Sequence, residues 1–460
     1  MTQQPDREPV SDPHITEDDI KEMFSEVLSV LDKTQLPLLG QDIFCRIQPQ
    51  LAGTDTMPVV GEPMYGSCHV LFPLTFHTGL RWLVKIPISG TTAKWDDLSA
   101  SSLIAEAKTM QFLKRETTIP LPDVLDFSST TQNALRCPYI VLSYISGVPL
   151  YDVWFGHRIN GDDLEVNRAR RTRALKGIAS AMIQLGRFPF RTSGSPIFAS
   201  DGALLGTGPL RRLNVEAMLD RWHVHKDPAS DPIYVSSAAS SDPKAYYTFM
   251  ADLHPENHLY QKGTKALLRQ MINWIPEPSG TDRFVLTHPD FDIQNFIVSE
   301  DGDLRGIIDW DGIAAVPRSI GNLRYPGWLT RDWDPSMYGY DESMDQGIKP
   351  VGVWEDSPSC LADYRRVYKD AIAEGQRDDS SVDLCRISLI TDNLLIAVDE
   401  PLCRGDIVHK FLHELWKRGG QGGEFYHNEV ITKMAENNVD DSVMNALRIG
   451  FDALLKEEGL

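Results

Sequence analysis

The chain has 460 residues, and its hydrophobic content of 42% is that of a globular protein with two lobes or domains. Asp and Glu outnumber Lys and Arg by 65 to 45. The resulting net charge of -20 argues against a nucleic acid or an anionic membrane as partner, because both require a basic surface.

The N-terminal residues 1–17 are polar and acidic, which predicts a disordered segment. Their composition argues against both a signal peptide and an arginine-rich transit peptide. The most apolar stretch, residues 387–398, is interrupted by polar side chains and is too short to span a bilayer. The six cysteines contain no Cys-x-x-Cys pair, which indicates a reducing compartment. These features together predict a cytoplasmic protein.

Residues 18–145 predict an N-terminal lobe made mostly of sheet. The predicted elements are a helix over residues 18–31, strands over 69–76 and 80–88, a helix over 103–115 and a strand over 138–145. His77-Thr78-Gly79 separates the first two strands and predicts a hairpin. We therefore expect a small sheet with one inserted helix.

Residues 146–460 predict a larger lobe that is mostly helical. The predicted helices lie over residues 171–185, 361–374, 385–398 and 440–456. One hairpin interrupts this helical half, with strands over 296–299 and 304–309. The two lobes together predict an α+β fold.

The segment 286–311 carries three side chains that suit phosphoryl transfer. That reaction needs a carboxylate to orient and deprotonate an acceptor hydroxyl, and oxygen ligands that hold magnesium against the phosphates. The residues that provide such groups are Asp290, Asn295 and Asp309.

The spacing of these residues predicts that two of them lie close together. A two-residue turn at Asp301-Gly302 pairs Asn295 with Ile308 and leaves Asp309 one residue beyond that pair. Both candidate metal ligands therefore come from one hairpin, and the combination is much more specific than either residue alone.

This segment resembles the catalytic loop and metal-binding aspartate of the aminoglycoside phosphotransferase family, which has a protein-kinase-like fold. Upstream, residues 66–72 and 79–87 resemble the nucleotide-loop hairpin that ends in a phosphate-binding lysine. Downstream, residues 325–335 are similar to a stretch found in one divergent branch of that family. The resemblance implies a β-rich nucleotide-binding lobe and a helical lobe that holds the catalytic loop and the acceptor pocket.

The resemblance also implies roles for individual residues. Asp290 is the catalytic base, Asn295 and Asp309 bind Mg²⁺, and Lys85 holds the α- and β-phosphates of ATP and pairs with Glu106. The nucleotide-binding residues implied in this way are Gly66, Ser67, Lys85, Glu106, Ser143 and Ile145, of which the last two belong to the interlobe hinge beside the adenine.

Three further residues and one stretch bear on this interpretation. Pro289 stands where the family usually has Gly, and Asp292 where many members have His. We expect His288 to brace the catalytic loop, and the tryptophan-rich stretch 328–333 to pack beneath it rather than to bind substrate.

The implied function is transfer of the terminal phosphate of ATP to a hydroxyl of a small molecule, either aminoglycoside-like or another metabolite. One alternative is a nucleotide-binding pseudokinase, which the presence of all the expected chemical groups disfavours. The other is a protein kinase, which is disfavoured because Pro289 rather than Arg precedes Asp290 and no Ala-Pro-Glu end of an activation segment is found. The acidic composition is compatible with a cationic acceptor.

Overall fold

The structure is a computed structural model that describes residues 17–51, 56–227, 231–277, 280–376, 379–420 and 426–457. The predicted disordered segment lies, except for residue 17, outside the described residues. Contacts divide the chain into two compact units. The described residues of the first unit are those up to 100, 124–144 and 231–232, and those of the second are 101–123, 145–227 and 233 onward. The predicted lobe boundary at residue 145 stays a prediction.

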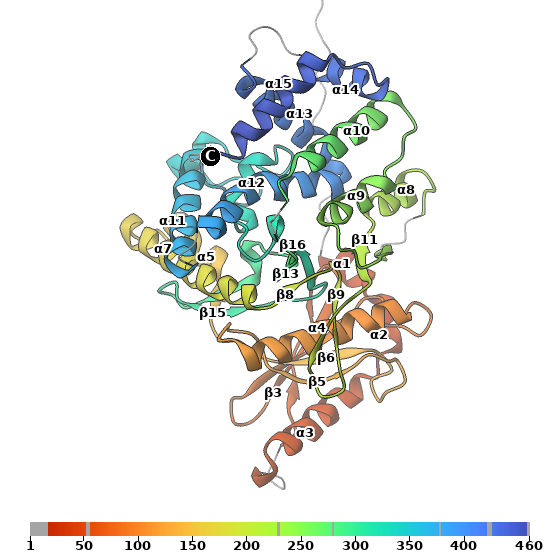
Figure 1. The fold of residues 1–460 in the computed structure, drawn as a ribbon. Coiled ribbons are helices and arrows are strands. Elements are labelled where there is room, and N and C mark those ends of the chain that lie inside the picture. Colours follow the sequence, from red (N-terminus) through yellow and green to blue (C-terminus); the bar gives the residue numbers. More distant parts are fainter. Residues whose placement is uncertain are drawn as a thin grey trace, which may run out of the picture. The chain divides into compact units, whose positions relative to one another are not determined.

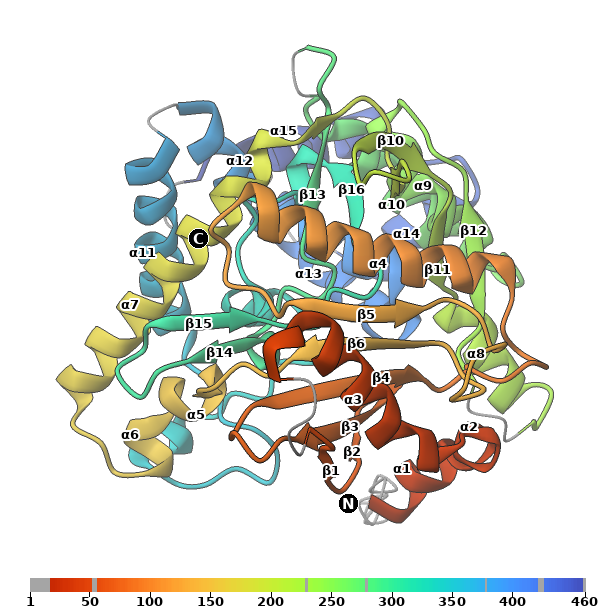
Figure 2. The ribbon, with the colours of Figure 1, turned by 90° about the horizontal axis from the view of Figure 1, so that it is seen from below.

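A six-stranded sheet forms the basis of the first unit. Its order is β1-β3-β4-β6-β5, and β2 pairs with β3 outside that order (Figure 2). The strands are β1 (Val59–Val60), β2 (Met64–Tyr65), β3 (His69–Thr75), β4 (Arg81–Pro87), β5 (Val124–Ser128) and β6 (Tyr139–Ser143). β3 and β4 pair antiparallel over their whole length, which confirms the predicted hairpin.

The apolar core of this unit depends on alternation in β3. Val70, Phe72 and Leu74 are buried, because successive side chains of a strand point to opposite faces. Aromatic rings extend the core, and the ring centroids of Phe44 and Phe76 are 4.9 Å apart. Phe44 lies on α3 (Leu36–Ile47), so this helix packs against the residues that follow β3.

The N-terminal part has more helices than the two predicted over residues 18–31 and 103–115. The helices here are α1 (Glu17–Met23), α2 (Ser25–Val30) and α3, with the short η1 (Lys33–Gln35) and η2 (Pro49–Leu51), while α4 (Asp97–Glu116) crosses the boundary between the units. Pro37 stands at the start of α3 and Gly40 within it, and both residues weaken its helical signal. Its buried positions nevertheless follow helical spacing, and that pattern was the signal available in the sequence.

The second unit is mostly helical, which confirms the predicted character of the C-terminal part (Figure 1). Its helices are α5 (Leu150–Trp154), α6 (Gly156–Ile159), α7 (Leu164–Ile183), α8 (Val215–His223), α9 (Pro243–Leu253), α10 (Leu259–Trp274), α11 (Pro358–Gln376), α12 (Asp379–Asp399), α13 (Pro401–Arg418), α14 (His427–Ala435) and α15 (Asp441–Leu454). α7, α11 and α12 pack side by side in this unit. Within the described ranges, no helix is long and apolar enough to cross a membrane.

Short strands and 3-10 turns position the predicted site in the second unit. The strands are β7 (Val148–Pro149), β8 (Pro189–Phe190), β9 (Ser195–Phe198), β10 (Leu204–Gly208), β11 (Leu210–Leu213), β12 (Tyr234–Ser237), β13 (Phe284–Thr287), β14 (Phe296–Val298), β15 (Leu304–Ile307) and β16 (Ala314–Pro317). The 3-10 turns are η3 (Gln184–Arg187), η4 (Ile293–Asn295), η5 (Arg318–Ile320), η6 (Gly327–Leu329), η7 (Arg331–Trp333) and η8 (Glu342–Gln346). β13 lies between β16 and β8, and β14 lies between β15 and β7.

Candidate functional site

The loop that carries Asp290 begins at the end of a fully buried strand. All four residues of β13 are buried, and the chain then leaves the sheet and forms η4. The exposed carboxylate of Asp290 accepts hydrogen bonds through Oδ2 from Gln294 Nε2 and from Asn295 Nδ2, each at 2.8 Å. Asn295 Nδ2 also donates to the main-chain oxygen of Asp290 at 2.7 Å. The structure therefore brings two of the predicted site residues into direct contact.

The hairpin that follows this loop has the predicted pairing near the site. Phe296 pairs with Ile307, and the main-chain nitrogen of Ile308 donates to the oxygen of Asn295 at 2.9 Å. The predicted pairing of Asn295 with Ile308 is thus confirmed. Asp309 follows directly, which brings the backbone of the two candidate metal ligands to neighbouring positions.

The predicted two-residue turn is wrong in its length. The main-chain nitrogen of Ser299 donates to the oxygen of Asp303 at 2.8 Å, and Val298 pairs with Leu304, so the loop has the three residues 300–302. A bulge at Arg305 compensates for the extra loop residue, because it shifts the register back before Gly306 pairs with Ile297. This compensation explains why the pairing at Asn295 is the one that the shorter turn predicted.

The tip of the hairpin packs closely against α7. Gly302 has a φ of 86°, and a Cβ atom there would lie 2.4 Å from the main-chain oxygen of Arg170. Only glycine combines this backbone conformation with so close an approach. Arg173 of the same helix donates to the main-chain oxygen of Asp301. α7 therefore holds the hairpin in place from one end.

Asp309 has an unusual backbone conformation. Its φ is 59°, in the left-handed region that few residues other than glycine adopt. The next residue, Trp310, is fully buried, and its Nε1 donates to the oxygen of Ile307 at 2.9 Å. This anchor holds the chain in the turn that leaves Asp309 exposed. Such strain is common at functional sites, where the surrounding structure enforces it.

His288 braces the loop, as predicted. Its ring is fully buried and packs on Trp310, with 4.7 Å between the ring centroids. Burial lowers the pKa of His288 to about 4, so the imidazole is neutral at neutral pH. Its Nε2 donates a hydrogen bond to the main-chain oxygen of Ile308 at 2.8 Å. This bond ties the start of the loop to the residue before Asp309.

An arginine from a distant segment also holds the loop, and the sequence analysis missed it. Arg324 Nη2 donates to the main-chain oxygen of His288 at 3.0 Å, and its Nη1 forms a 2.7 Å ion pair with Asp392 of α12. The side chains of Arg324 and Asp392 are 12% and 8% exposed. Because 68 residues separate the two partners, no local pattern in the sequence indicates the pair.

Breaking this buried pair is expected to destabilise the protein strongly. Asp392→Ala leaves the Arg324 guanidinium buried without its carboxylate, which costs about 3–5 kcal/mol. The exposed pair Arg366–Asp363 has the same 2.7 Å separation, so Asp363→Ala is the matched control with an expected loss of at most about 1 kcal/mol. Urea unfolding measures both values. Equal losses in the two variants would contradict a bracing role for the buried pair.

A second ion pair fixes the other end of the loop. Asp292 Oδ1 accepts from the nitrogen of Ile293 at 2.7 Å, and its Oδ2 accepts from Arg331 Nη2 at 2.6 Å. Arg331 also lies 3.8 Å from the carboxylate of Glu355, which is only 6% exposed. Asp292 therefore has a structural partner in this chain.

Stability is expected to fall as Glu355 ionises. Burial raises its pKa from 4.5 to about 7, with Asp292 and Asp356 adding to the effect and Arg331 opposing it. The pKa is higher in the folded state, so this stabilising contribution is complete below about pH 4.5 and is lost as the pH rises through 7. Glu355→Gln should therefore be more stable than the wild type at pH 8, by at most about 3 kcal/mol, and should lose this advantage at pH 4.5. Urea unfolding at both pH values tests this, and a constant difference would contradict it.

The tryptophan-rich stretch packs beneath the loop, which confirms the prediction. Trp328 and Trp333 are buried, and the ring centroid of Trp328 is 5.6 Å from that of Phe296. The ring centroid of Trp333 is 5.7 Å from that of Phe411 on α13. These side chains join the hairpin of β14 and β15 to the helices rather than presenting a surface to substrate.

The predicted phosphate-binding residues lie on the sheet of the first unit. Gly66 and Ser67 form the connection between β2 and β3. Lys85 lies on β4 between Leu71 and Ile140, in the middle of the sheet. Its side chain is only 6% exposed, which is rare for lysine unless the charge is paired.

The remaining predicted nucleotide residues come from different elements. Glu106 lies on α4 and is 3% exposed, and its ion pair with Lys85 stays a prediction. Ser143 ends β6, and Ile145 packs so closely on Gly306 of β15 that a Cβ atom there would lie 2.3 Å from Cδ1 of Ile145. Within the second unit, Ile145 of the predicted hinge thus touches the hairpin of β14 and β15.

The oxygen atoms of Asn295 and Asp309 are of the kind that a magnesium ion prefers as ligands. Asn295 uses its amide nitrogen for Asp290, so its Oδ1, which accepts no hydrogen bond within the described residues, is left for another partner. Across those residues, no group of three or more His, Cys, Asp or Glu side chains is arranged to hold a metal. Magnesium is typically bound by one or two carboxylates together with substrate phosphates, which matches a set of Asn295 and Asp309.

Comparison with known proteins gives a family match and remote relatives. A family model described as "Phosphotransferase enzyme family" matches residues 74–314, more than half of the chain. "Altered inheritance of mitochondria protein 9, mitochondrial" of Candida albicans (strain SC5314) is 27% identical over 207 residues, 42% of this chain and 32% of that protein. The protein of the same name from Kluyveromyces lactis is 21% identical over 330 residues, 62% of this chain and 53% of that protein. The chain thus spans about a third to a half of the length of these curated relatives.

Solved structures show a more distant likeness. The crystal structure of aminoglycoside phosphotransferase APH(4)-Ia is 14% identical in sequence to this chain. The match covers 89% of this chain and 97% of that chain, with a TM-score of 0.39. At this identity and score, the likeness carries no argument about activity.

The predicted cytoplasmic location is wrong in the light of these relatives, which are named as mitochondrial proteins. The prediction relied on the composition of the first residues and on scattered cysteines. A short targeting segment decides the compartment, and the composition of a folded body carries little information about it.

Proposed function

Because the chain belongs to the phosphotransferase enzyme family, we propose that it transfers the terminal phosphate of ATP, with Mg²⁺, to a hydroxyl group of a small molecule. The observation that carries the proposal is the pair of contacts made by Asn295. Its amide donates to the Asp290 carboxylate at 2.8 Å, and its main chain accepts from Ile308 at 2.9 Å. One asparagine thus links the candidate base to the turn that presents Asp309.

The proposed reaction assigns a separate task to each group. The oxygen of the acceptor hydroxyl bonds to the γ-phosphorus, and Asp290 Oδ1 accepts the proton that this oxygen loses. At the same time, the bond between the γ-phosphorus and the β-γ bridging oxygen breaks. The products are ADP and the phosphorylated acceptor. Asn295 and Asp309 would hold Mg²⁺, which when bound neutralises charge on the phosphates. The hydrogen bonds from Gln294 and Asn295 hold the carboxylate of Asp290 in position.

The nucleotide side of the proposal rests on the first sheet and its surroundings. We assign the phosphates to Lys85 and to the backbone of Gly66 and Ser67, and the adenine to the backbone of Ser143 and Ile145. A lysine buried in the middle of a sheet needs a counter-charge, and Glu106 and the nucleotide phosphates are the proposed ones.

To test this function, the purified protein is incubated with Mg²⁺, ATP and a panel of hydroxyl-bearing metabolites and aminoglycosides. Mass spectrometry should detect an acceptor heavier by one phosphate together with ADP. Nucleotide binding without any transfer would support the pseudokinase alternative instead. Transfer to protein substrates in preference to every small molecule would support a protein kinase.

Loss of the Lys85 charge is expected to weaken nucleotide binding. Lys85→Met keeps the apolar stem that packs in the sheet and removes the ammonium group. We therefore expect the variant to keep its fold and to bind ATP at least about tenfold more weakly than the wild type. Isothermal titration with Mg²⁺ and ATP measures the affinity. Lys108→Met, on α4, is the control, and unchanged affinity in Lys85→Met would remove Lys85 from the site.

A further inference from the structure

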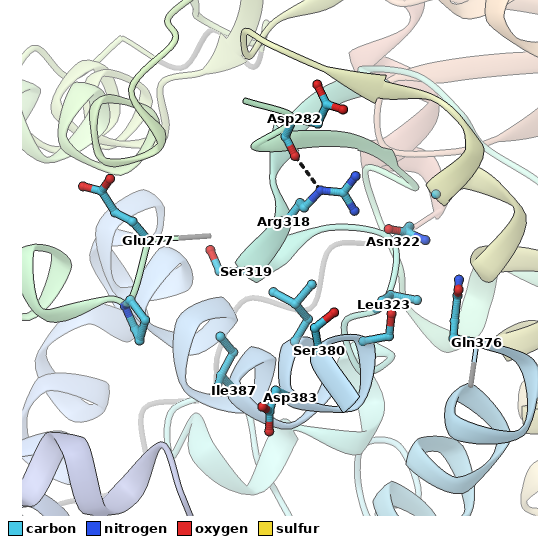
Figure 3. A pocket seen from close by; sticks show the side chains of 14 residues that line it. Glu277, Asp282, Arg318, Ser319, Asn322, Leu323, Gln376, Ser380, Asp383 and Ile387 are labelled. Atoms are coloured by element: carbon cyan, nitrogen blue, oxygen red, sulfur yellow. Dashed lines mark hydrogen bonds between the residues drawn. The ribbon is translucent and has the colours of Figure 1, made fainter. Parts of the chain in front are cut away.

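A cavity of about 620 Å³ lies in the second unit, beside the start of β13, whereas Asp290 follows the end of that strand (Figure 3). Its walls come from η5, the segment before β13, the end of α11 and the first turns of α12. The volume is in the range of small-molecule sites. None of the predicted catalytic or nucleotide-binding residues lines this cavity.

One guanidinium group in this cavity is held in place but has no acidic partner among the residues that the structure describes. Arg318 Nε donates to the main-chain oxygen of Asp282 at 2.7 Å, and Figure 3 shows the terminal nitrogens of the guanidinium directed to the side of Asn322. In the described part of the chain, no carboxylate lies within ion-pair distance of Arg318. By contrast, Glu277 and Asp383 of the same cavity each pair with an arginine that does not line it.

A buried amide complements this guanidinium. Asn322 is 3% exposed, and its Nδ2 donates to the main-chain oxygen of Met182 at 2.8 Å. That bond fixes the orientation of the amide, so Oδ1 lies on the side of Arg318 (Figure 3). Oδ1 accepts no hydrogen bond from the described residues. Because Asn322 lines the cavity, this oxygen is available to a group that enters it.

We propose that this cavity binds a small metabolite that carries an anionic group, either a carboxylate or a phosphate, next to a hydroxyl or amino group. Arg318 offers two terminal nitrogens in the forked geometry that such anions accept. Asn322 Oδ1 accepts the neighbouring hydroxyl or amino hydrogen. The hydroxyl of Ser380 and the amide of Gln376 line the same cavity and offer further polar contacts (Figure 3).

The same helix connects this cavity to the proposed catalytic loop. The first turns of α12 line the cavity, and further along that helix Thr391 Oγ1 donates to the oxygen of Ser319 at 2.6 Å. The next residue, Asp392, holds Arg324, which in turn holds the main chain at His288. A ligand in the cavity is therefore expected to change the turnover of phosphotransfer, an effect that rests on the proposed function.

Binding is tested with the full chain and two probes, inorganic phosphate and D-glycerate, by isothermal titration. We expect saturable binding of at least one probe to the wild type. Arg318→Gln should bind that probe at least about tenfold more weakly. Arg366→Gln removes an exposed guanidinium of α11 that does not line the cavity, and its affinity should match the wild type. Binding of phosphate alone assigns a phosphate ligand, and binding of glycerate alone assigns a carboxylate.

A second variant keeps Arg318 in place. Ser380→Glu puts a carboxylate at the exposed edge of the cavity, where it competes for the guanidinium, and should also weaken the probe. Equal affinity in the wild type and in both variants, or no saturable binding of either probe, would overturn the site. A chain that binds the probe but transfers no phosphate would refute the proposed function and leave the site intact.

Discussion

Asp290→Asn is expected to lower the turnover of phosphotransfer by about 10²- to 10⁴-fold and to leave the binding of Mg²⁺ and ATP close to that of the wild type. Asp290 Oδ2 accepts from Gln294 and Asn295, whereas Oδ1 accepts no hydrogen bond from the described residues. An asparagine satisfies the two amide donors with its single oxygen and turns its NH₂ group toward the acceptor. The variant therefore keeps the loop but cannot take the proton of the acceptor hydroxyl.

Asp301→Asn is the matched control for this experiment. Asp301 is exposed at the tip of the same hairpin, so its substitution makes the same chemical change away from the proposed chemistry. Steady-state kinetics, nucleotide titration and thermal unfolding are measured on both variants. Full turnover in Asp290→Asn would refute the role of the base, and a parallel loss of stability and nucleotide binding would indicate a structural brace.

Asp309→Asn is expected to weaken nucleotide binding in the presence of Mg²⁺ by at least about tenfold and to leave the weaker binding without Mg²⁺ unchanged. The hard cation prefers a charged oxygen ligand, and Asn295 offers only a neutral one. Asparagine tolerates the left-handed conformation nearly as well as aspartate, so the backbone at φ 59° is expected to persist. Nucleotide titration with and without Mg²⁺ measures the effect, and normal metal dependence would remove Asp309 from the site.

Asp309→Gly separates the loss of charge from the backbone strain. Glycine adopts a φ of 59° without steric cost, so relief of strain is expected to contribute about 1 kcal/mol of stability to this variant. The same variant should lose its metal-dependent nucleotide binding. A gain in stability with a loss of binding would indicate that the strained turn serves the site. A destabilised glycine variant would contradict strain at this position.

The elements that carry the candidate chemistry could be predicted from the sequence because local spacing sets them. The pairing of Asn295 with Ile308 depends on a hairpin of a few residues, and even the error in turn length was offset by the bulge at Arg305. The strands that contain Lys85 and its neighbours were likewise predicted from short apolar runs. Roles for individual residues came from the family resemblance and stay proposals.

The helices that the prediction missed show the opposite case. α13 has six buried positions at helical spacing, but Gly405 and a mixture of charged residues lie among them. α3 was hidden in the same way by Pro37 and Gly40. In both, tertiary packing of one apolar face outweighs weak local propensity.

The sequence by itself determined the α+β character, the hairpin of β14 and β15 and the set of groups suited to phosphoryl transfer, because each of these follows from local patterns of residues. Only the tertiary structure decided what holds that set in place: Asp392 against Arg324 and Arg331 against Asp292. It alone also placed Arg318, which has no acidic partner among the described residues, on the side of the Asn322 amide (Figure 3). Buried charges find their partners across distant elements, and which elements meet is settled by the packing of the whole unit rather than by any local pattern.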